Sequence, residues 1–255
     1  MGEGGPLHMV SAWSEQNRIV LGAVKTSSKS NEITAITDLL NLLILKRGDV
    51  VTIDAIGCQK SIVNRIVEQG ADYVIALKKN QRNLVAEVEN FFDQALEAPD
   101  YAPWEGGKIP CEKRGDKDKQ EVWVSHNLDW LPQREEWTKL RSIVMVHRRW
   151  EEKGVVLEER RYYISSLQDS AEKLAHIVRR HWSIENELHW HMDVTFQEDA
   201  SQIGATANES LRVARMAALE LLRAETEFKR GLKAKMRRCL RSESYLERVL
   251  VSGNF

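Results

Sequence analysis

The first hundred residues alternate between β-like and helical patterns of hydrophobic and polar side chains. Residues 7–13 alternate apolar and polar side chains, the turn sequence SEQN follows, and residues 18–25 form a second β-like run. Residues 32–45 show a helical pattern with leucine and isoleucine crowded on one side, as in a helix packed on a sheet. The alternation continues with predicted strands at 50–54 and 71–78 and predicted helices at 59–69 and 82–96. Strands that alternate with helices predict a largely parallel sheet, and hence an α/β protein.

The pattern changes after Pro99. Four of the five prolines fall within residues 99–169, which also carry many charges and three β-like runs, EVWVSH, RSIVMVHRRW and VVLEERRYYISSL. These features predict an antiparallel β-rich insertion rather than further strand–helix units. From residue 170 onward the chain has no proline, and a helical pattern covers 171–192 and 208–225. We therefore predict four parts, which are the first part of the core at 7–98, the β-rich insertion at 99–169, the acidic helix and closing helices of the core at 170–226, and a basic segment at 227–255.

Composition narrows the class of protein. The chain has 255 residues with 37 basic and 38 acidic side chains, a net charge of −1, which excludes a histone-like or acidic-tail protein but leaves room for local clusters. Its three cysteines form no CxxC pair, so neither a disulfide framework nor a structural zinc site is indicated. The longest apolar stretch, at 39–45, is far shorter than the ~20 residues of a membrane span, and the first ten residues show no secretory-signal pattern. We expect a soluble cytoplasmic protein with no membrane association.

Asp54 is the first candidate for chemistry, because it ends a short apolar strand and is followed by AIGCQ. In an open α/β sheet, ligands gather at the carboxyl ends of strands, so a carboxylate at this position is well placed for catalysis or metal binding. The same residue could instead cap the helix that follows. Its position alone leaves both interpretations open.

Glu185 is the second candidate, within the helical run HWSIENELHWHMDVTFQEDAS. Apolar side chains lie near the same side of this helix, and burying a lone carboxylate among them is costly, so Glu185 needs a basic partner or a cation. The first of three interpretations pairs it with an arginine such as Arg180. The second is a zinc site with His181 and His189, although the HExxH spacing of zincins is absent. The third is a site for a hard cation such as Mg²⁺, completed by carboxylates from elsewhere.

Two polar segments are candidates for contact with nucleic acid. The segment KRGLKAKMRRCLR, at 229–241, holds seven Lys or Arg and no acidic residue, which suits phosphate contacts but is also typical of a solvated helical face. Four polar residues at the carboxyl end of the strand at 71–78 share a sheet edge with Asp54, where they could meet a DNA backbone or be ordinary loop residues. The candidate DNA-binding residues are Lys78, Lys79, Asn80, Gln81, Lys233, Lys235, Arg237 and Arg238.

Four segments, taken in order, resemble one protein family. The stretches TIDAIGCQ, ADYVIALKKNQ, YYISSL and HWSIENELHWHMDVTFQEDAS resemble transposases of the H-repeat-associated (ISAs-type) insertion-sequence family, and the resemblance covers nearly the whole chain. These transposases belong to the DDE superfamily, whose catalytic core is ribonuclease-H-like. The resemblance implies that Asp54 corresponds to the family's second catalytic aspartate and Glu185 to its catalytic glutamate. It also implies that 99–169 is the insertion that precedes the last acidic helix.

The resemblance further implies a reaction and its partners. A DDE transposase of a bacterial insertion sequence cuts the ends of its element and joins them to target DNA, by phosphodiester hydrolysis followed by strand transfer. Carboxylates suit this reaction because two Mg²⁺ (or Mn²⁺) ions held by them can clamp the attacking and leaving oxygens. The implied metal ligands are Asp54 and Glu185. The implied partners are double-stranded DNA, as element ends and target, and further copies of the chain in a homo-oligomer.

One expected part of the catalytic site has no match. The family's first catalytic aspartate lies on the strand before the one predicted at 7–13, where this sequence has only MGEGGP, with Glu3 as its single acid. That first strand is central in a ribonuclease-H-like sheet, so without it both neighbouring strands expose an unpaired edge. We therefore expect a transposase that is incomplete and inactive alone. The alternatives are a non-catalytic DNA-binding or inert remnant of a transposase gene and, less consistent with the β-rich insertion, a stand-alone nuclease of ribonuclease-H type.

Overall fold

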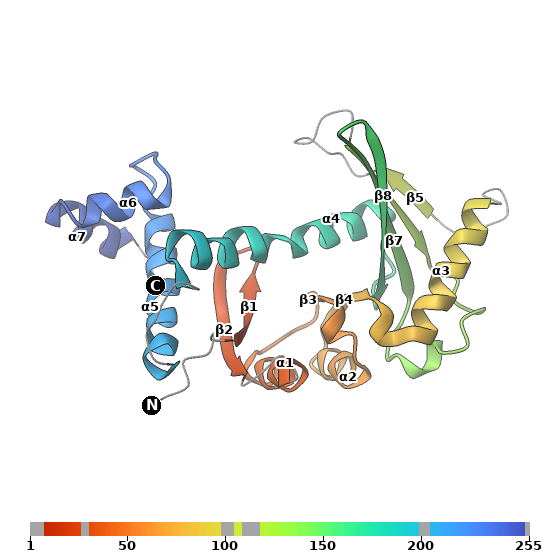
Figure 1. Ribbon diagram of the computed structural model, residues 1–255. Helices are drawn as coiled ribbons and strands as arrows, with labels where there is room; N and C mark the ends of the chain where they lie inside the picture. The colour runs from red at the N-terminus through yellow and green to blue at the C-terminus, as the bar shows by residue number, and fades with distance from the viewer. Residues whose placement is uncertain (1–7, 27–30, 98–104, 109–117, 199–204, 253–255) are drawn as a thin grey trace. The chain divides into compact units, whose positions relative to one another are not determined.

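The chain forms two compact units (Figure 1). The computed structural model describes residues 8–26, 31–97, 105–108, 118–198 and 205–252. We call Ser30–His181 the core unit, and Met1–Lys29 together with Trp182–Phe255 the terminal unit, because the latter combines the two ends of the chain. Each unit has buried apolar clusters of its own.

The core unit is built on a six-stranded sheet. Its strands are β3 (Val50–Ile53), β4 (Asp72–Leu77), β5 (Glu105–Lys108), β6 (Asp118–Ser125), β7 (Ser142–Glu152) and β8 (Val155–Ser165). Their order across the sheet is β3-β4-β8-β7-β6-β5. β3 and β4 are parallel, whereas each of the other neighbouring pairs is antiparallel. The parallel pair needs a crossover connection, which the helical residues between the two strands provide.

The sheet differs from the predicted one in the relative direction of its strands. The prediction of a largely parallel sheet is wrong, since β3 and β4 are the one parallel pair among the described strands. The antiparallel arrangement predicted for the β-rich insertion is confirmed, but its strands do not form a sheet of their own. β8 returns beside β4 and pairs with it, so that Ile75 lies opposite Ile164. This pairing satisfies backbone N–H and C=O groups of β4 that burial would otherwise leave unpaired.

Helices cover the two faces of the sheet. They are α1 (Glu32–Leu42), α2 (Lys60–Glu68), α3 (Arg82–Glu97) and α4 (Ala171–His181). Figure 1 shows α4 on one side of β3 and β4, and α1 and α2 on the other. Leu174 and Val178 of α4 pack in one cluster with Val74. Tyr73 and Ile75, the neighbours of Val74, point to the opposite face and are also fully buried. Two covered faces explain why β4 reads as a continuous apolar run.

The terminal unit combines a hairpin with helices from the other end of the chain. Its elements are β1 (His8–Ser14), β2 (Ile19–Thr26), the π-helical turns η6 (Glu185–His189) and η7 (His191–Thr195), α5 (Ala205–Ala224), α6 (Leu232–Cys239) and α7 (Glu243–Ser252). β1 and β2 are antiparallel, with Trp13 opposite Val20. These two residues pack against Leu188 and Met192 of the π-helical turns and against Leu219 of α5. The hairpin therefore belongs to the same core as the segment that carries Glu185.

Each of the two sheets has outer edges that no described strand covers. β3 lies at the end of its sheet, and β1 pairs with β2 alone in the part of the chain that the structure describes. The lack of a first ribonuclease-H-like strand and of its aspartate stays a prediction. Within the described ranges, none of the helices combines the length and the apolar character that crossing a membrane requires.

Candidate active site and nucleic-acid interface

Asp54 occupies an exposed position directly after β3. Its backbone is extended, with φ −69° and ψ −179°, and its carbonyl oxygen accepts a hydrogen bond from the Gly57 amide at 3.1 Å, which begins the short 3₁₀ helix η2 (Ala55–Gly57). The carboxylate makes no capping hydrogen bond to that helix. The capping interpretation is therefore not supported. A carboxylate at the carboxyl end of a strand in an open α/β sheet can instead bind a ligand from solvent.

The loop at the carboxyl end of β4 is fastened to the loop that carries Asp54. Asn80 donates from Nδ2 to the carbonyl oxygen of Ala55 at 2.6 Å. Gln81 donates from Nε2 to the carbonyl oxygen of Cys58 at 2.8 Å. Both residues lie in the 3₁₀ helix η3 (Lys79–Gln81). These two hydrogen bonds join the carboxyl ends of two parallel strands and hold the backbone directly after Asp54 in place.

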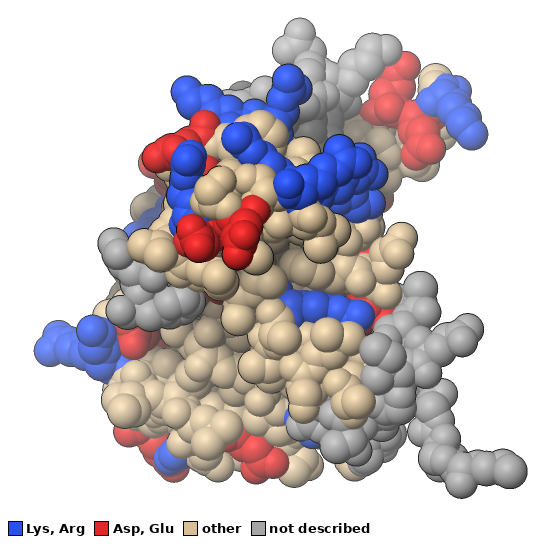
Figure 2. Space-filling model, turned by 90° about the vertical axis from the view of Figure 1, so that its left-hand side faces the viewer, with Lys and Arg blue, Asp and Glu red and all other residues tan. Residues whose placement is uncertain are grey.

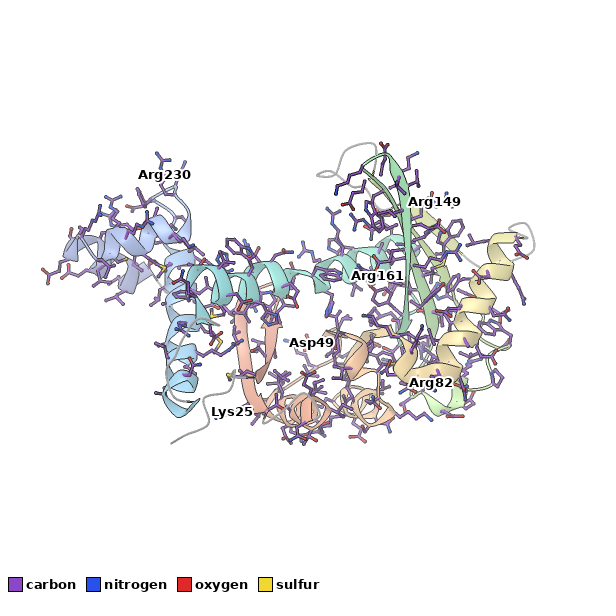
Figure 3. All side chains as sticks on the ribbon, viewed as in Figure 1. Lys25, Asp49, Arg82, Arg149, Arg161 and Arg230 are labelled. Atoms are coloured by element: carbon purple, nitrogen blue, oxygen red, sulfur yellow. The ribbon has the colours of Figure 1, made fainter. Side chains whose placement is uncertain are left out.

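The four residues predicted to contact DNA beside Asp54 fall into two groups in the structure. The amide donors of Asn80 and Gln81 bind backbone carbonyls, so these residues position the loop. Lys78 and Lys79 are exposed on the same loop. Arg82, labelled in Figure 3, begins α3 directly after it. Three cationic side chains therefore lie close in sequence around the carboxyl end of β4, where phosphate contacts stay a prediction.

Close packing explains the rest of the AIGCQ sequence. A Cβ atom on Gly57 would lie 2.3 Å from Ile53 Cγ2, so no larger residue fits there without a shift of the strand or the loop. Cys58 is fully buried, and burial raises the pKa of its thiol to about 12, which keeps it protonated. Both residues therefore shape the loop that presents Asp54.

Glu185 opens the π-helical turn η6, and its side chain is 56% exposed. The helix predicted across 171–192 ends as an α-helix at His181 and continues as π-helical turns. Each π-helical turn takes in an additional residue and so rotates the following side chains. As a result, Leu188 and Met192 are buried while Glu185 faces solvent. The interpretation in which Glu185 is buried among these apolar side chains is therefore not supported. Such π-helical insertions are frequent at functional sites.

The structure separates the three interpretations of Glu185. Its partner in the structure is His189, whose Nδ1 lies 3.3 Å from Glu185 Oε1, rather than Arg180. His181 instead places its Nδ1 3.0 Å from the Thr52 hydroxyl oxygen. Among the described residues, no group of three or more His, Cys, Asp or Glu side chains could hold a metal ion, so the zinc interpretation is not supported. A hard-cation site completed by carboxylates from elsewhere stays a prediction.

An ion-pair network that sequence reasoning did not find ties the π-helical turns to the hairpin. Arg18 donates from Nη2 to Glu187 Oε1 at 2.5 Å, and Arg223 donates from Nη2 to Glu187 Oε2 at 3.1 Å and to the carbonyl oxygen of the same residue. Burial disfavours the charge of Glu187, but the hydrogen bond and charge of Arg18 outweigh burial and lower its pKa. No local pattern relates these three positions, because they lie in three distant parts of the sequence.

The predicted DNA-binding segment contains one interior lysine. Lys235 has a side chain that is 9% exposed, and its ammonium donates to the carbonyl oxygens of Leu222, at 2.8 Å, and of Glu225. The ammonium also lies 3.4 Å from Glu225 Oε2. The prediction that Lys235 contacts DNA is therefore contradicted, because its ammonium group is buried and pairs with the carboxylate of Glu225.

Glu225 is the centre of this buried cluster. Tyr245 donates its hydroxyl hydrogen to Glu225 Oε2 at 2.7 Å, and the Phe228 amide donates to Oε1 at 2.9 Å. Burial by itself would raise the pKa of Glu225, but these hydrogen bonds and the charge of Lys235 lower it below its usual value. Burial and the bond to Glu225 raise the pKa of Tyr245 to about 12. The cluster joins the end of α5 to α6 and α7.

The other predicted residues of the segment are exposed. Lys233, Arg237 and Arg238 all face solvent on α6. The Arg238 guanidinium also lies 4.4 Å from the centre of the Phe228 ring and 4.6 Å from that of Tyr245. Figure 2 looks onto the side that carries α6 and α7 and shows Lys and Arg gathered there, with acidic side chains beside them. Phosphate contacts by these three residues stay a prediction.

The two candidate catalytic carboxylates belong to different units. Asp54 lies in the core unit and Glu185 in the terminal unit, so their convergence stays a prediction. Both are exposed, and neither is bound by an Arg or Lys of the described chain. Carboxylate oxygens are the ligands that Mg²⁺ prefers, so the donor chemistry of each residue fits a divalent metal ion.

Comparison with known proteins identifies the family. The fold defines a mixed α/β protein, and the family model described as "Transposase DDE domain" matches residues 5–221. The chain is 38% identical over 255 residues to "Putative transposase YncI" of Escherichia coli O157:H7, with 97% of this chain and 64% of that protein covered. It is 36% identical over 258 residues to "H repeat-associated putative transposase YhhI" of Escherichia coli (strain K12), with coverage of 98% and 67%. The chain therefore belongs to the DDE transposase family.

Family membership confirms two predictions made from the sequence. The resemblance to H-repeat-associated transposases is confirmed, and the family implies a ribonuclease-H-like core for the α/β part. The chain spans about two thirds of the length of these two relatives, at 64% and 67%.

Proposed function

We propose that this chain carries out the DNA chemistry of a DDE transposase, with Asp54 and Glu185 as ligands of divalent metal ions. The observation that most supports the proposal is the exposed carboxylate of Asp54, placed directly after the partly buried strand β3 on a loop that Asn80 fastens in position. Preorganised ligands of this kind lower the cost of binding a metal ion. Bound Mg²⁺ or Mn²⁺ would stabilise the charge that develops on the attacked phosphodiester.

The cationic residues of the chain would bind the DNA itself. We place Lys78 and Lys79 on phosphates near the reacting bond, since they lie at the same edge of the sheet as Asp54. Lys233, Arg237 and Arg238 would hold phosphates through α6. Contacts of this kind position a protein on double-stranded DNA, here element ends and target, without reading its sequence. Joining two element ends requires two such surfaces, which suits an assembly of two or more copies of the chain.

A second candidate function is DNA binding without cutting. It is favoured by the finding that the described residues form no group of three carboxylates or other metal-binding side chains. Two carboxylates neutralise less of the charge on two divalent ions than three do. Under this second candidate, the chain by itself would bind DNA and cut it poorly or not at all. Efficient cleavage of element-end DNA by the purified chain with Mg²⁺ would contradict this expectation.

Mn²⁺ binding tests whether Asp54 and Glu185 share a metal site. Isothermal titration of the purified chain with Mn²⁺ is compared with Asp54→Asn, Glu185→Gln and the double variant. If both carboxylates bind one ion, each single substitution weakens binding and the double variant loses little more, because the effects of residues sharing one ligand are not additive. Glu172→Gln, which changes an exposed glutamate of α4, is the matched control and leaves the affinity unchanged. Unchanged affinity in both single variants, or additive losses, would overturn the shared site.

A further inference from the structure

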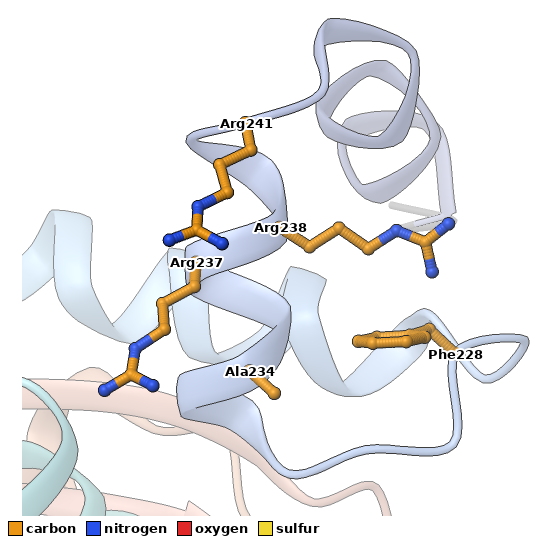
Figure 4. A pocket seen from close by; sticks show the side chains of 5 residues that line it. All are labelled: Phe228, Ala234, Arg237, Arg238 and Arg241. Carbon is orange, nitrogen blue, oxygen red and sulfur yellow. The ribbon is translucent and has the colours of Figure 1, made fainter.

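A hollow lined by arginines lies on α6, outside the residues proposed for catalysis. Its volume is about 350 Å³, and Figure 4 shows the five side chains that line it. Four of them recur at spacings of three and four residues, so they share one face of the helix and of the turn that follows it. The lining residues are Phe228, Ala234, Arg237, Arg238 and Arg241.

Positive charge in this hollow is not balanced by any acidic side chain that the structure describes there. No acidic side chain lines it, and Arg237 and Arg241 form no ion pair with any described residue. Figure 4 shows these two guanidinium groups pointing to the same side of α6. Like charges one helical turn apart repel each other, so an anion between them would relieve the repulsion. The neighbouring carboxylate of Glu225 cannot do so, because it is buried and bound by Lys235 and Tyr245.

The apolar part of the lining is held in place before any ligand arrives. The Phe228 amide donates to Glu225 Oε1 at 2.9 Å, which fixes the loop that carries the ring. The Phe228 ring meets the Tyr245 ring edge to face, with 5.8 Å between centres. Arg238 lies over both rings, so its guanidinium is ordered by packing as well as by charge. A rigid aromatic and aliphatic surface beside two unpaired guanidinium groups is therefore already formed.

These features select a ligand with a flat apolar body and an anionic group. Guanidinium groups bind phosphate through paired N–H donors, and bases pack on aromatic side chains when they are not stacked in a duplex. Pockets for small ligands begin at roughly 300 Å³, so a hollow of about 350 Å³ has room for one nucleotide unit but not for a double helix. In a duplex the bases are stacked inside the helix, so only the sugar–phosphate backbone could reach the rim of the hollow.

We propose that this hollow binds one unpaired nucleotide of DNA, with its phosphate between Arg237 and Arg241 and its base against Phe228 and Ala234. The inference rests on the proposed DNA-binding function and adds to it a preference for a single-stranded segment, such as a frayed or cut DNA end. It does not depend on Asp54 or Glu185, because neither residue lines the hollow.

Fluorescence anisotropy with EDTA present tests the proposal without metal-dependent chemistry. The probes are a labelled single-stranded oligonucleotide and a blunt duplex of the same sequence. We expect Arg237→Gln combined with Arg241→Gln to weaken binding of the single strand roughly tenfold or more, and binding of the duplex by a clearly smaller factor. The matched control removes two charges from exposed residues of the same segment outside the hollow, Lys229→Gln with Arg230→Gln, and should leave the ratio of the two affinities unchanged.

Phe228→Leu separates base contact from charge, since it keeps an apolar side chain of similar size and every arginine. We expect it to weaken single-strand binding and to leave duplex binding unchanged, with the helical circular dichroism signal retained. Equal losses for single strand and duplex in the double-arginine variant, or no loss in either, would overturn the proposal. Because these measurements contain no metal, they can succeed when the Mn²⁺ experiment fails, and the two outcomes are distinguishable.

Discussion

Replacing Lys235 by methionine removes a buried charge while keeping most of the side-chain volume. The ammonium is lost from three contacts, two with backbone carbonyls and one with Glu225 Oε2 at 3.4 Å. Breaking a buried ion pair by removing one partner typically costs about 3–5 kcal/mol, because the remaining charge is left uncompensated. Glu225 keeps its hydrogen bonds from Tyr245 and Phe228. We therefore expect a loss near the lower end of that range, about 3 kcal/mol.

Lys233→Met is the matched control, because it makes the same substitution two residues away on the exposed side of α6. We expect it to change stability by no more than about 0.5 kcal/mol. It should instead weaken DNA binding. The slope of log affinity against log salt concentration should become shallower by about one, as expected for the loss of one phosphate contact.

Native-state hydrogen exchange of peptides that span α6 and α7 is the appropriate assay, since a chain with two units need not unfold in a single step. The reasoning is refuted if Lys235→Met leaves protection of these peptides equal to that of Lys233→Met.

Three further predictions concern the candidate site and the buried cluster. Asn80→Ala removes the hydrogen bond to the Ala55 carbonyl and should cost about 1 kcal/mol, with faster hydrogen exchange in the loop after Asp54. Gly57→Ala should destabilise the core unit by about 1–3 kcal/mol in urea unfolding, because its new Cβ would overlap Ile53 Cγ2. The lowered pKa of Glu225 stabilises α6 and α7 above the unfolded-state pKa of about 4.3, and this contribution is lost as the pH falls through the lower folded-state value, which exchange measured across the acid range would show.

Each of these predictions has a control within the chain. Gln94→Ala removes an exposed side-chain amide from α3 and should leave the loop after Asp54 unchanged, so an equal effect of both amide substitutions would contradict the Asn80 prediction. Gly231→Ser changes a glycine whose added Cβ would have no atom within 4 Å, and it should be nearly neutral; a neutral Gly57→Ala would contradict the close-packing argument. Tyr245→Phe removes a hydrogen bond to Glu225 and should weaken the acid dependence, and an unaltered pH profile would count against it.

Much of the local structure followed from the sequence. The strand predicted at 71–78 is β4 (Asp72–Leu77), and the helix predicted at 82–96 is α3 (Arg82–Glu97). Both predictions rest on periodicity within one segment, which depends on neighbouring residues only. The helix predicted at 171–192 was right as far as His181 and then failed, because the switch to π-helical turns depends on how Leu188 and Met192 pack against the hairpin.

Side-chain roles were harder to predict where they depend on distant residues. Lys233 and Lys235 look alike in the sequence, yet one is exposed and the other binds a carboxylate ten residues earlier in the chain. Asn80 appeared to be a polar loop residue, but it donates to Ala55, 25 positions away. In each case the partner is set by the packing of separate elements.

The amino-acid sequence by itself determined the alternation of strands and helices, the resemblance to the transposase family, and the basic character of the last helices. These properties are carried by residue type and by local spacing. The tertiary structure alone decided that β8 pairs with β4, that Glu185 faces solvent, and that Lys235 is interior. Burial and pairing are decided when segments far apart in the sequence meet, because the free energy of a charge or a strand edge depends on what surrounds it.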